Sequence, residues 1–506
     1  LASACAIMGR ERTLRMSELE ARKTHLEEFL RAHAGAGLEV SEDGELLFLL
    51  SENGYEVRQE AGKLLLHLWS DERTWVRRVV GIGEPVRGRL EISVERFRLR
   101  TPATLTLAKP RVGLPGEAER RTARRKYATF FRRLLQREFP RGRIEHLSTA
   151  ADLKNSFSGL YTRALVSVAG TSWAVLGVNA AEATEGVDAI LAYGLIWLDW
   201  NRRRHPERVF AGLRVYVPAG RGELTASRLL ALDPALGRSE LYEVNQEAFT
   251  CQPVAAEPGN WNTRLLPAAW AAEVNRSEES SVERVCALAP HVIERVVLPG
   301  RAQVSLRVRG LEFARAARGE VRFGIGKDLQ PLTPRNWAKL ETLVRELVGR
   351  RAPGGEPSDC FYRAQPERWL ESAVLEQIHV LDPRLERDQV YRQVPAFVGG
   401  ERGVVDLVGA SHEGQLMVIE LKASSDLQLP LQGLDYWQRV RWHQRRGELE
   451  SFGYFPRQPL RPDPPELLLV APAFQFHPTT EPLVRYFAPE VRVTLVGFNE
   501  DWRRGL

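Results

Sequence analysis

Cysteine is scarce in this sequence. The 506-residue chain has only Cys5, Cys251, Cys286 and Cys360, and no two of them form a CxxC pair or share the spacing of a Cys/His metal site. This spacing argues against a structural zinc ion. Few cysteines are typical of proteins from a reducing compartment, so we expect a cytoplasmic location.

Long apolar runs are absent as well. No stretch approaches the roughly 20 apolar residues that a membrane-spanning helix needs, so we expect no membrane partner. The first eight residues are too short for the apolar part of a signal peptide, and charged residues follow at once. Because residue 1 is leucine, we expect the natural chain to begin at Met8, at Met16 or at a non-AUG codon.

The sequence also contains no P-loop, no zinc finger and no RNA-recognition motif. Any helicase activity must therefore come from a partner protein. The chain has 71 Lys and Arg residues against 65 Asp and Glu residues, a net charge of +6. This mild excess permits a nucleic-acid partner but does not distinguish DNA from RNA. Length and an ordinary composition indicate three or four globular domains.

Residues 402–446 carry the clearest chemical pattern. A β-rich apolar run is interrupted by one acid, Asp406, and residues 417–423 then alternate between apolar and charged. Successive side chains of a strand face opposite ways, so Glu420 and Lys422 share a face, about 6–7 Å apart along the strand. If the two strands pair, Asp406 meets Glu420. Two carboxylates beside a lysine suit a hard cation such as Mg²⁺ or Mn²⁺.

An aspartate followed on the next strand by (Asp/Glu)-X-Lys resembles the PD-(D/E)XK nuclease superfamily. The pattern here is Val405-Asp406 and then Glu420-Leu421-Lys422, with valine in place of the usual proline. The following helix carries Gln432 and Tyr436, four residues apart and so on one face. This QxxxY pattern resembles the RecB-like branch, and the resemblance covers roughly residues 365–502.

The resemblance implies an αβββαβ core like that of restriction endonucleases, and an endonuclease that depends on Mg²⁺ or Mn²⁺. DNA is the expected substrate and RNA the alternative. The implied metal ligands are Asp406, Glu420, the Leu421 carbonyl and a helical glutamate, for which Glu371 is preferred over Glu376. Lys422 would position or help to deprotonate the attacking water, while Gln432 would hold Lys422 or a phosphate oxygen and Tyr436 a neighbouring phosphate.

Two further expectations depend on this resemblance. Some RecB-like nucleases hold an iron–sulfur cluster with cysteines around the core, but no cysteine follows this core, so we expect no cluster. The competing interpretations are a nucleic-acid-binding scaffold that does not cut and an ordinary surface ion pair at Glu420 and Lys422. His412, in the predicted turn near the acids, is a weaker site candidate.

The first half of the chain resembles this region. Residues 174–179 match 417–422 at an offset of 243, and residues 166–170 match 405–409. Similarity at such a long period indicates a duplicated domain, with chance resemblance as the alternative. Asp406, Glu420, Lys422, Gln432 and Tyr436 then correspond to Ser167, Gly177, Asn179, Ala189 and Tyr193. None of the first four replacements supplies a carboxylate, so we expect a pseudonuclease.

These patterns predict a multidomain protein of α/β and α+β class with two small β-rich domains. A single chain with one active and one degenerate core could act alone, as a homodimer or with partner proteins. Residues 117–139 form an arginine-rich helix, interpreted as a solvated face or a phosphate-binding patch. The predicted segments are 1–110 (helix and β-rich), 111–250 (pseudonuclease), 251–284 (connector), 285–355 (β-rich with a helix) and 356–506 (nuclease).

Overall fold

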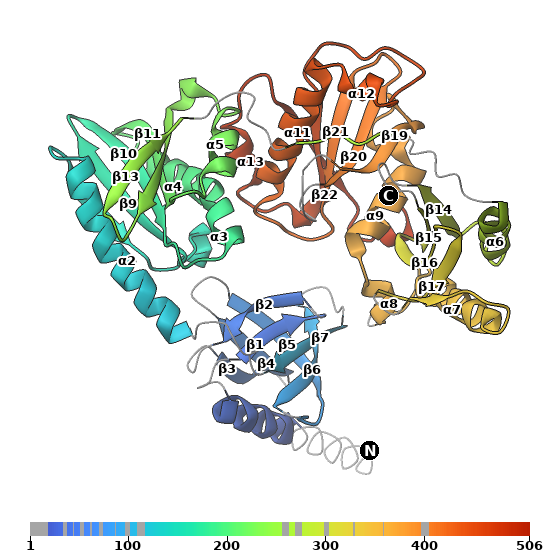
Figure 1. The fold of residues 1–506 in the computed structure, drawn as a ribbon. Coiled ribbons are helices and arrows are strands. Elements are labelled where there is room, and N and C mark those ends of the chain that lie inside the picture. The colour runs from blue at the N-terminus through green and yellow to red at the C-terminus, as the bar shows by residue number, and fades with distance from the viewer. Residues whose placement is uncertain are drawn as a thin grey trace, which may run out of the picture. The chain divides into compact units, whose positions relative to one another are not determined.

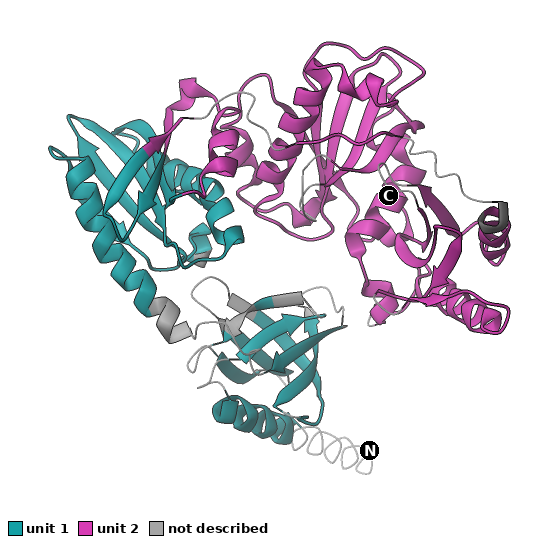
Figure 2. Cartoon of the chain, viewed as in Figure 1, with its two compact units in different colours: residues 1–219, 242–252 teal, residues 220–241, 253–506 magenta. Residues whose placement is uncertain are grey.

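The computed structural model describes the chain except for residues 1–18, 34–37, 44, 51–54, 61–62, 70–73, 87, 97–101, 109–116, 256–262, 269–275, 298–302, 327–328, 358 and 396–403. The expected start residues lie outside the described part. Four β-sheets with flanking helices confirm the predicted mixed α/β, multidomain class. The chain divides into two compact units, one of residues 1–219 and 242–252, the other of residues 220–241 and 253–506 (Figure 2).

The first sheet of unit 1 has seven strands in the order β2-β1-β7-β6-β5-β4-β3. Alternating apolar residues such as Leu64, Leu66 and Leu68 point into its core, where a helix over residues 19–33 adds Leu26 and Leu30. The strands are β1 (Leu38–Glu42), β2 (Glu45–Leu50), β3 (Tyr55–Glu60), β4 (Lys63–Trp69), β5 (Thr74–Ile82), β6 (Arg89–Arg96) and β7 (Pro102–Ala108).

The second sheet has the order β13-β12-β11-β10-β9-β8 and lies between two helices (Figure 1). Helix α2 (Glu117–Glu138) packs its Tyr127 and Phe131 on one face, and α4 (Ile190–Arg204) covers the other. Hairpin β9–β10 is antiparallel and β10–β11 is parallel. The remaining elements are β8 (Arg143–Ser148), β9 (Tyr161–Val168), β10 (Thr171–Val178), α3 (Thr184–Asp188), β11 (Val209–Pro218), β12 (Arg238–Asn245) and β13 (Thr250–Val254).

Unit 2 contains a five-stranded antiparallel sheet in sequence order from β14 to β18. Helix α7 (Trp337–Arg350) contributes Leu340, Val344 and Leu347 to its core, at the spacing of one helix face. Gly310, with a φ of 78°, lets the β15–β16 turn approach the start of the next domain, because a Cβ there would lie 2.1 Å from the Arg368 carbonyl oxygen. The other elements are α6 (Arg276–Cys286), β14 (Ile293–Val297), β15 (Val304–Val308), β16 (Leu311–Ala317), β17 (Glu320–Phe323) and β18 (Gln330–Pro331).

The last sheet has the order β19-β20-β21-β22-β23. Its first two pairs are antiparallel and its last two are parallel. Helix α9 packs on one face of the sheet and α11 on the other (Figure 1). The elements are α8 (Cys360–Arg363), α9 (Pro366–Glu376), α10 (Ile378–Leu381), β19 (Leu385–Pro395), β20 (Val404–Ser411), β21 (Leu416–Leu421), α11 (Leu429–Arg445), α12 (Glu448–Ser451), β22 (Glu466–Pro472), α13 (Thr480–Val484) and β23 (Arg492–Phe498).

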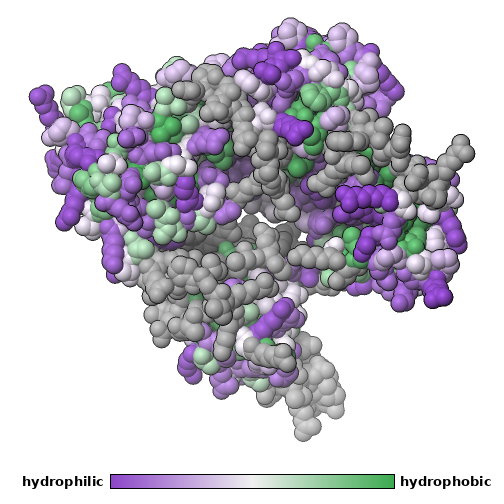
Figure 3. All heavy atoms as spheres, in the orientation of Figure 1, coloured by the Kyte–Doolittle hydropathy of each residue, from purple (hydrophilic) through white to green (hydrophobic). Residues whose placement is uncertain are grey.

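The surface is mainly hydrophilic, and apolar residues are scattered over the visible face in small groups (Figure 3). In the part of the chain that the structure describes, no helix combines the length and the apolar character that crossing a membrane requires.

A buried ion pair holds α5 (Glu223–Leu229), which belongs to unit 2, against α11. Arg228 donates two hydrogen bonds to the Asp435 carboxylate, at 2.9 and 2.7 Å, and both residues are buried. The Gln438 amide also donates to the Ser227 carbonyl. Because the two charges are removed from water, each depends on the other for compensation.

We expect Arg228→Met to lower the free energy of unfolding by about 3–5 kcal/mol, because Asp435 would stay buried without its counter-charge. Urea unfolding followed by tryptophan fluorescence would measure the change. The control is Arg485→Met, which removes an exposed ion pair at 3.9 Å and should cost less than about 1 kcal/mol. Equal effects of the two substitutions would contradict the prediction.

Candidate functional site

The β20–β21 ladder ends just before the two predicted acids. Its last backbone pair is Leu407–Ile419, and the next residues along are Asp406 and Glu420. The Leu421 N–H donates instead to Oδ2 of Asp406, at 3.1 Å. Since Ile419 and Leu421 pack into the core beneath α9, the intervening Glu420 faces α11. The strand register therefore places two carboxyl groups side by side.

Glu420 is the most isolated charge at this site. Its side chain is buried, and Oε1 lies 3.3 Å from the Lys422 ammonium nitrogen. Among the described residues, no group donates a hydrogen bond to its Oε2. Burial raises the pKa of Glu420 well above its usual value, and repulsion from Asp406, within hydrogen-bonding reach, raises this pKa further. Two acceptor groups this close need a proton or a cation between them.

Asp406 is perturbed in the same direction. Burial, and then the negative charge of Glu371, raise the pKa of Asp406 to about 6. Arg368, whose guanidinium lies 3.7 Å from Oδ1, and the Leu421 N–H partly offset this rise. A carboxyl group that resists ionisation to this degree is typical of a site that a cation completes.

Lys422 is held as a cation. Burial acts to lower the pKa of Lys422, but the charges of Glu420, Asp426, Asp406 and Glu367 outweigh it, and the net direction is upward. Its nitrogen lies 4.0 Å from the Asp426 carboxylate. The ammonium is therefore protonated at neutral pH and can donate hydrogen bonds, whereas proton abstraction by its neutral form is disfavoured.

Glu371 is fully engaged by the protein. The Gln393 amide donates to both of its oxygens, at 2.9 and 3.2 Å, and Arg368 donates at 2.6 Å. The Arg392 guanidinium lies 3.8 Å away. A cation on Glu371 would have to displace Arg368, so Glu371 fits the role of a metal ligand poorly. Glu376, the alternative, is exposed on α9.

Gln393 is a site residue that sequence reasoning missed. Its φ of 52° is in the left-handed region, which costs a non-glycine residue on the order of 1 kcal/mol or more. The strand register, with Arg392 opposite Leu407, places it opposite Asp406 on the other edge of β20. Nothing in the strand sequence marked this position. The helical pair Arg368 and Glu371, three residues apart, could have been anticipated from their spacing.

The predicted QxxxY residues lie on the helix that covers this face. Tyr436 is buried, and burial followed by the charges of Glu420 and Asp406 raises its pKa. Gln432 Oε1 is buried and accepts no hydrogen bond from the described residues. The predicted contact between Gln432 and Lys422 is therefore not made in this state.

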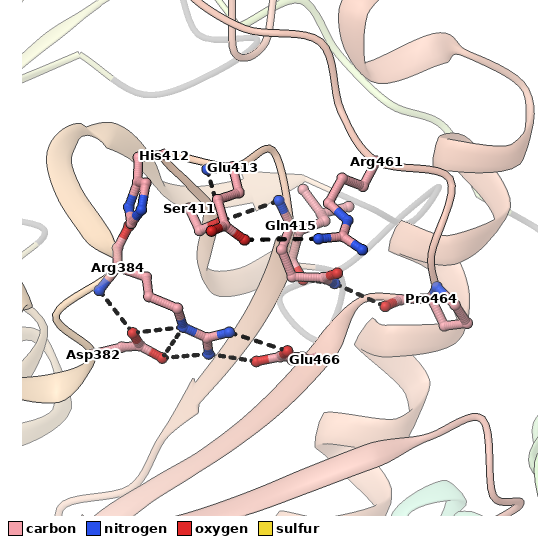
Figure 4. Close-up of polar contacts among 10 residues, drawn as sticks. Asp382, Arg384, Ser411, His412, Glu413, Gln415, Arg461, Pro464 and Glu466 are labelled. Carbon is pink, nitrogen blue, oxygen red and sulfur yellow. Dashed lines mark hydrogen bonds and ion pairs between the residues drawn. The ribbon is translucent and has the colours of Figure 1, made fainter.

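His412 does not belong to the site. It lies in the turn of the β20–β21 hairpin, at the opposite end from Asp406, and faces the Arg384 carbonyl (Figure 4). The same view shows Arg384 between Asp382 and Glu466, a structural ion-pair network at the far end of the sheet. The weaker prediction that His412 belongs to the site is wrong, because the eight-residue strand β20 extends between this turn and the acids.

A divalent cation fits part of the predicted ligand set. Asp406 and Glu420 converge with one oxygen unsatisfied, and the Leu421 carbonyl lies beyond the last β20–β21 pair. Among the described residues, however, no group of three or more Asp, Glu, His and Cys side chains is arranged to hold a metal ion. Glu371, the third acid, is instead bound to Arg368 and Gln393.

The first sheet-and-helix unit has the same order of elements, but the predicted residue matches are wrong. In β9–β10, Gly177 pairs with Thr162, whereas Ser167 pairs with Ser172 next to the turn. Ser167 is thus at the opposite end of its hairpin from the position of Asp406. The offset changes because residues 169–170 make a two-residue turn, shorter than the turn of the β20–β21 hairpin.

Gly177 also lies on the wrong face to match Glu420. A Cβ at Gly177 would meet Phe131 and Tyr127 of α2 at 2.6–2.7 Å, whereas Glu420 faces α11. A shift of one residue along a strand exchanges its two faces. The α4 face at this end of the hairpin carries the pair Tyr161 and Val178, and the ring centroids of Tyr161 and Tyr193 lie 4.8 Å apart. Neither residue of this pair carries a carboxyl group.

The predicted residue match between helices α4 and α11 is displaced by one helical turn. Gly194 and Gly433 approach the sheet in the same way. Each glycine lies against two apolar side chains of the next parallel strand, β11 for Gly194 and β22 for Gly433. Aligning these glycines places Tyr193 at the position of Gln432 and Trp197 at that of Tyr436. The predicted equivalence of Tyr193 with Tyr436 is therefore wrong, because the connection before α4 differs in length from the one before α11.

Comparison of the sequence with protein-family models and with curated proteins finds no match.

The raised carboxyl pKa values predict a stability that falls as pH rises. Asp406 titrates near 3.8 when unfolded and near 6 when folded, so the folded state binds the extra proton between these values. The free energy of unfolding therefore falls as pH rises from about 4 to above 6, by about 3 kcal/mol from this group. In EDTA at pH 7.5, we expect Asp406→Asn to be more stable than the wild type by about 2 kcal/mol.

Denaturant unfolding at pH 4 and pH 7.5 checks this, because the difference should vanish at pH 4. Glu413→Gln, at an exposed acid in the same hairpin, is the control. A destabilised Asp406→Asn protein at pH 7.5 would contradict the prediction.

Proposed function

We propose that residues 356–506 form a metal-dependent endonuclease that hydrolyses phosphodiester bonds in DNA. The observation that carries the proposal is the close pair of Asp406, which is partly buried, and Glu420, which is fully buried and whose Oε2 accepts no hydrogen bond from the described residues. Lys422 and Arg368 offset these charges only in part, and a buried charge without full compensation is costly, so a divalent cation fits between the two acids. Lys422 adds a positive charge where a phosphate would approach.

The order of elements supports the same proposal. The sequence α9, β19, β20, β21, α11, β22 is the αβββαβ order that the resemblance to PD-(D/E)XK nucleases implies. In this assignment the acids lie at the end of the central hairpin, and the QxxxY helix covers their face. The element order and the residue chemistry are independent observations, and both favour a nuclease core.

Asp406 and Glu420, with the Leu421 carbonyl, are the residues that would hold Mg²⁺ or Mn²⁺. When bound, the ion would supply a water molecule of lowered pKa and would neutralise charge on the phosphate. Asp406 and Glu420 would hold this ion at the end of the β20–β21 hairpin. Lys422, protonated at neutral pH, donates to a non-bridging phosphate oxygen and stabilises the charge that develops there.

The surrounding residues position this group. Glu371 holds Arg368 next to Asp406, and Gln393 fixes Glu371 from β19. Tyr436 places a hydroxyl near the two acids, where it can donate to a phosphate oxygen. The Gln432 amide has a buried oxygen that accepts no hydrogen bond from the described residues and would be available to Lys422 or to another donor that enters the site.

The second candidate is a nucleic-acid-binding scaffold that does not cut. It is favoured by one observation: Arg368 lies 3.7 Å from Asp406 and 2.6 Å from Glu371, and so neutralises part of the acidic charge without a metal. A scaffold would bind nucleic acid in EDTA and never cleave it. An RNA-directed nuclease is distinguished by its substrate alone, because phosphate contacts carry no information on the sugar.

We expect Asp406→Ala, Glu420→Ala and Lys422→Ala each to reduce Mg²⁺- or Mn²⁺-dependent cleavage by about 100-fold or more, because each removes a charge that acts on the transition state. A panel of labelled duplex, single-stranded, branched and RNA substrates measures the rates. Glu413→Ala, an exposed acid in the same hairpin, is the control and should cut like the wild type (Figure 4). Full activity in Glu420→Ala would refute the proposal.

A single active core in each chain predicts nicking rather than double-strand cleavage. With supercoiled plasmid as substrate, the open-circular form should accumulate first and the linear form only later. The product ratio should be independent of protein concentration if one chain acts alone. Direct appearance of linear plasmid at low concentration would show that two active sites act together.

A further inference from the structure

Helix α2 carries a ridge of positive charge on its outer face. Arg125, Lys126, Arg132 and Arg133 are all exposed, and we refer to these four residues as the α2 ridge. With 3.6 residues per turn, they fall within about 120° of the helix circumference. The buried residues Tyr127, Phe131, Leu134 and Leu135 occupy the opposite side, against the β8–β13 sheet.

The α2 ridge has no acidic partners among the described residues. Its neighbours on the same helix are neutralised, since Arg124 binds Glu182 at 2.9 Å and Arg137 binds Glu138 at 3.0 Å. No Asp or Glu occurs between Glu119 and Glu138. The side chains of Arg120 and Arg121, in the same arginine-rich stretch of sequence, lie outside the described residues.

The spacing of the ridge suits a phosphate backbone. Seven residues separate Arg125 from Arg132 and Lys126 from Arg133, which is about 10.5 Å along the helix axis. Phosphates of one strand of B-DNA follow each other at about 3.4 Å along the duplex axis, so this distance spans about three of them. Guanidinium groups bind phosphate oxygens in pairs, and three of the four ridge residues are arginines.

A membrane surface fits this helix less well. An interfacial helix needs an apolar face toward the lipid, but the apolar face of α2 is buried in its own sheet. Thr129 and Gln136, on the same side of the helix as the ridge, are polar and exposed. No large hydrophobic side chain of α2 is among those that the described part of the chain exposes. A polyanion that approaches from water fits better.

We propose that the α2 ridge binds the sugar–phosphate backbone of duplex DNA, without metal and without reading bases. In this proposal the β8–β13 sheet and its helices hold the DNA, although they have no acids at the positions of Asp406 and Glu420. The interaction is electrostatic, so its strength falls steeply as salt concentration rises. No carboxylate of residues 356–506 takes part in this binding, so the proposal does not depend on whether that domain cleaves DNA.

The test measures binding of the full-length protein to a fluorescent 30-bp duplex in EDTA, by anisotropy at several salt concentrations. Lys126→Gln/Arg133→Gln removes two contacts, so the slope of log Kd against log salt should become shallower by about 2. Affinity at about 0.1 M salt should fall at least about tenfold on the same counterion-release grounds. Glutamine keeps the helix propensity, and circular dichroism checks the fold.

The matched control is Lys339→Gln/Arg345→Gln, which removes one lysine and one arginine from exposed sites on α7. There the cations are interleaved with Glu341 and Glu346, so the control should leave slope and affinity unchanged. A ridge variant that binds like the wild type would overturn the proposal. So would a loss confined to RNA, to single-stranded DNA or to vesicles of phosphatidylserine.

Because cleavage plays no part in EDTA, this result is separate from that of the nuclease assay. Loss of binding in the ridge variant, with no cutting by the wild type, would support the ridge and reject the proposed function. Normal binding in the ridge variant, with metal-dependent cutting by the wild type, would reject the ridge and support the proposed function.

Discussion

The proximity of two carboxyl groups, the buried Glu420 and the partly buried Asp406, is the constraint on which the C-terminal domain depends. Antiparallel pairing of β20 with β21 brings them together, and the ladder ends where they meet. Burial raises both pKa values, and repulsion adds to this rise, from Glu371 on Asp406 and from Asp406 on Glu420, so the fold holds an arrangement that is unfavourable by itself. Such an arrangement is expected where a cation or a charged substrate restores the balance.

The residues around the pair compensate for it in part. Arg368 lies between Glu371 and Asp406, and Gln393 holds Glu371 at the expense of a left-handed backbone conformation. A left-handed residue of β19 and an unsatisfied oxygen of Glu420 therefore lie at the same end of the sheet. Elsewhere on this sheet, as around Arg384, charges are paired at normal distances. The contrast points to function at the Asp406 end.

Two segments of the chain share one order of elements and use it differently. In the first, Phe131 and Tyr127 lie directly over Gly177, and the ring of Tyr161 contacts that of Tyr193. The exposed cations of the α2 ridge lie on the outer face of that helix. The two segments thus carry different charged features on one order of elements.

The sequence by itself determined which residues carry chemistry on each strand. Alternation in residues 417–423 required Glu420 and Lys422 to share a face, and the 3.6-residue period of 117–139 required an apolar side and a basic side. These are local properties, because backbone geometry alone decides which side chains point together.

Only the tertiary structure decided what each acid contacts and which residues correspond between the two segments. Gln393 approaches Glu371 from a strand 22 residues away in sequence, and no local pattern encodes that contact. The match of Gly177 to Glu420 failed because turn lengths shifted the register by an odd number, which exchanges the faces of a strand. Sequence similarity aligns letters, whereas hydrogen-bonded pairing of strands decides on which face a side chain lies.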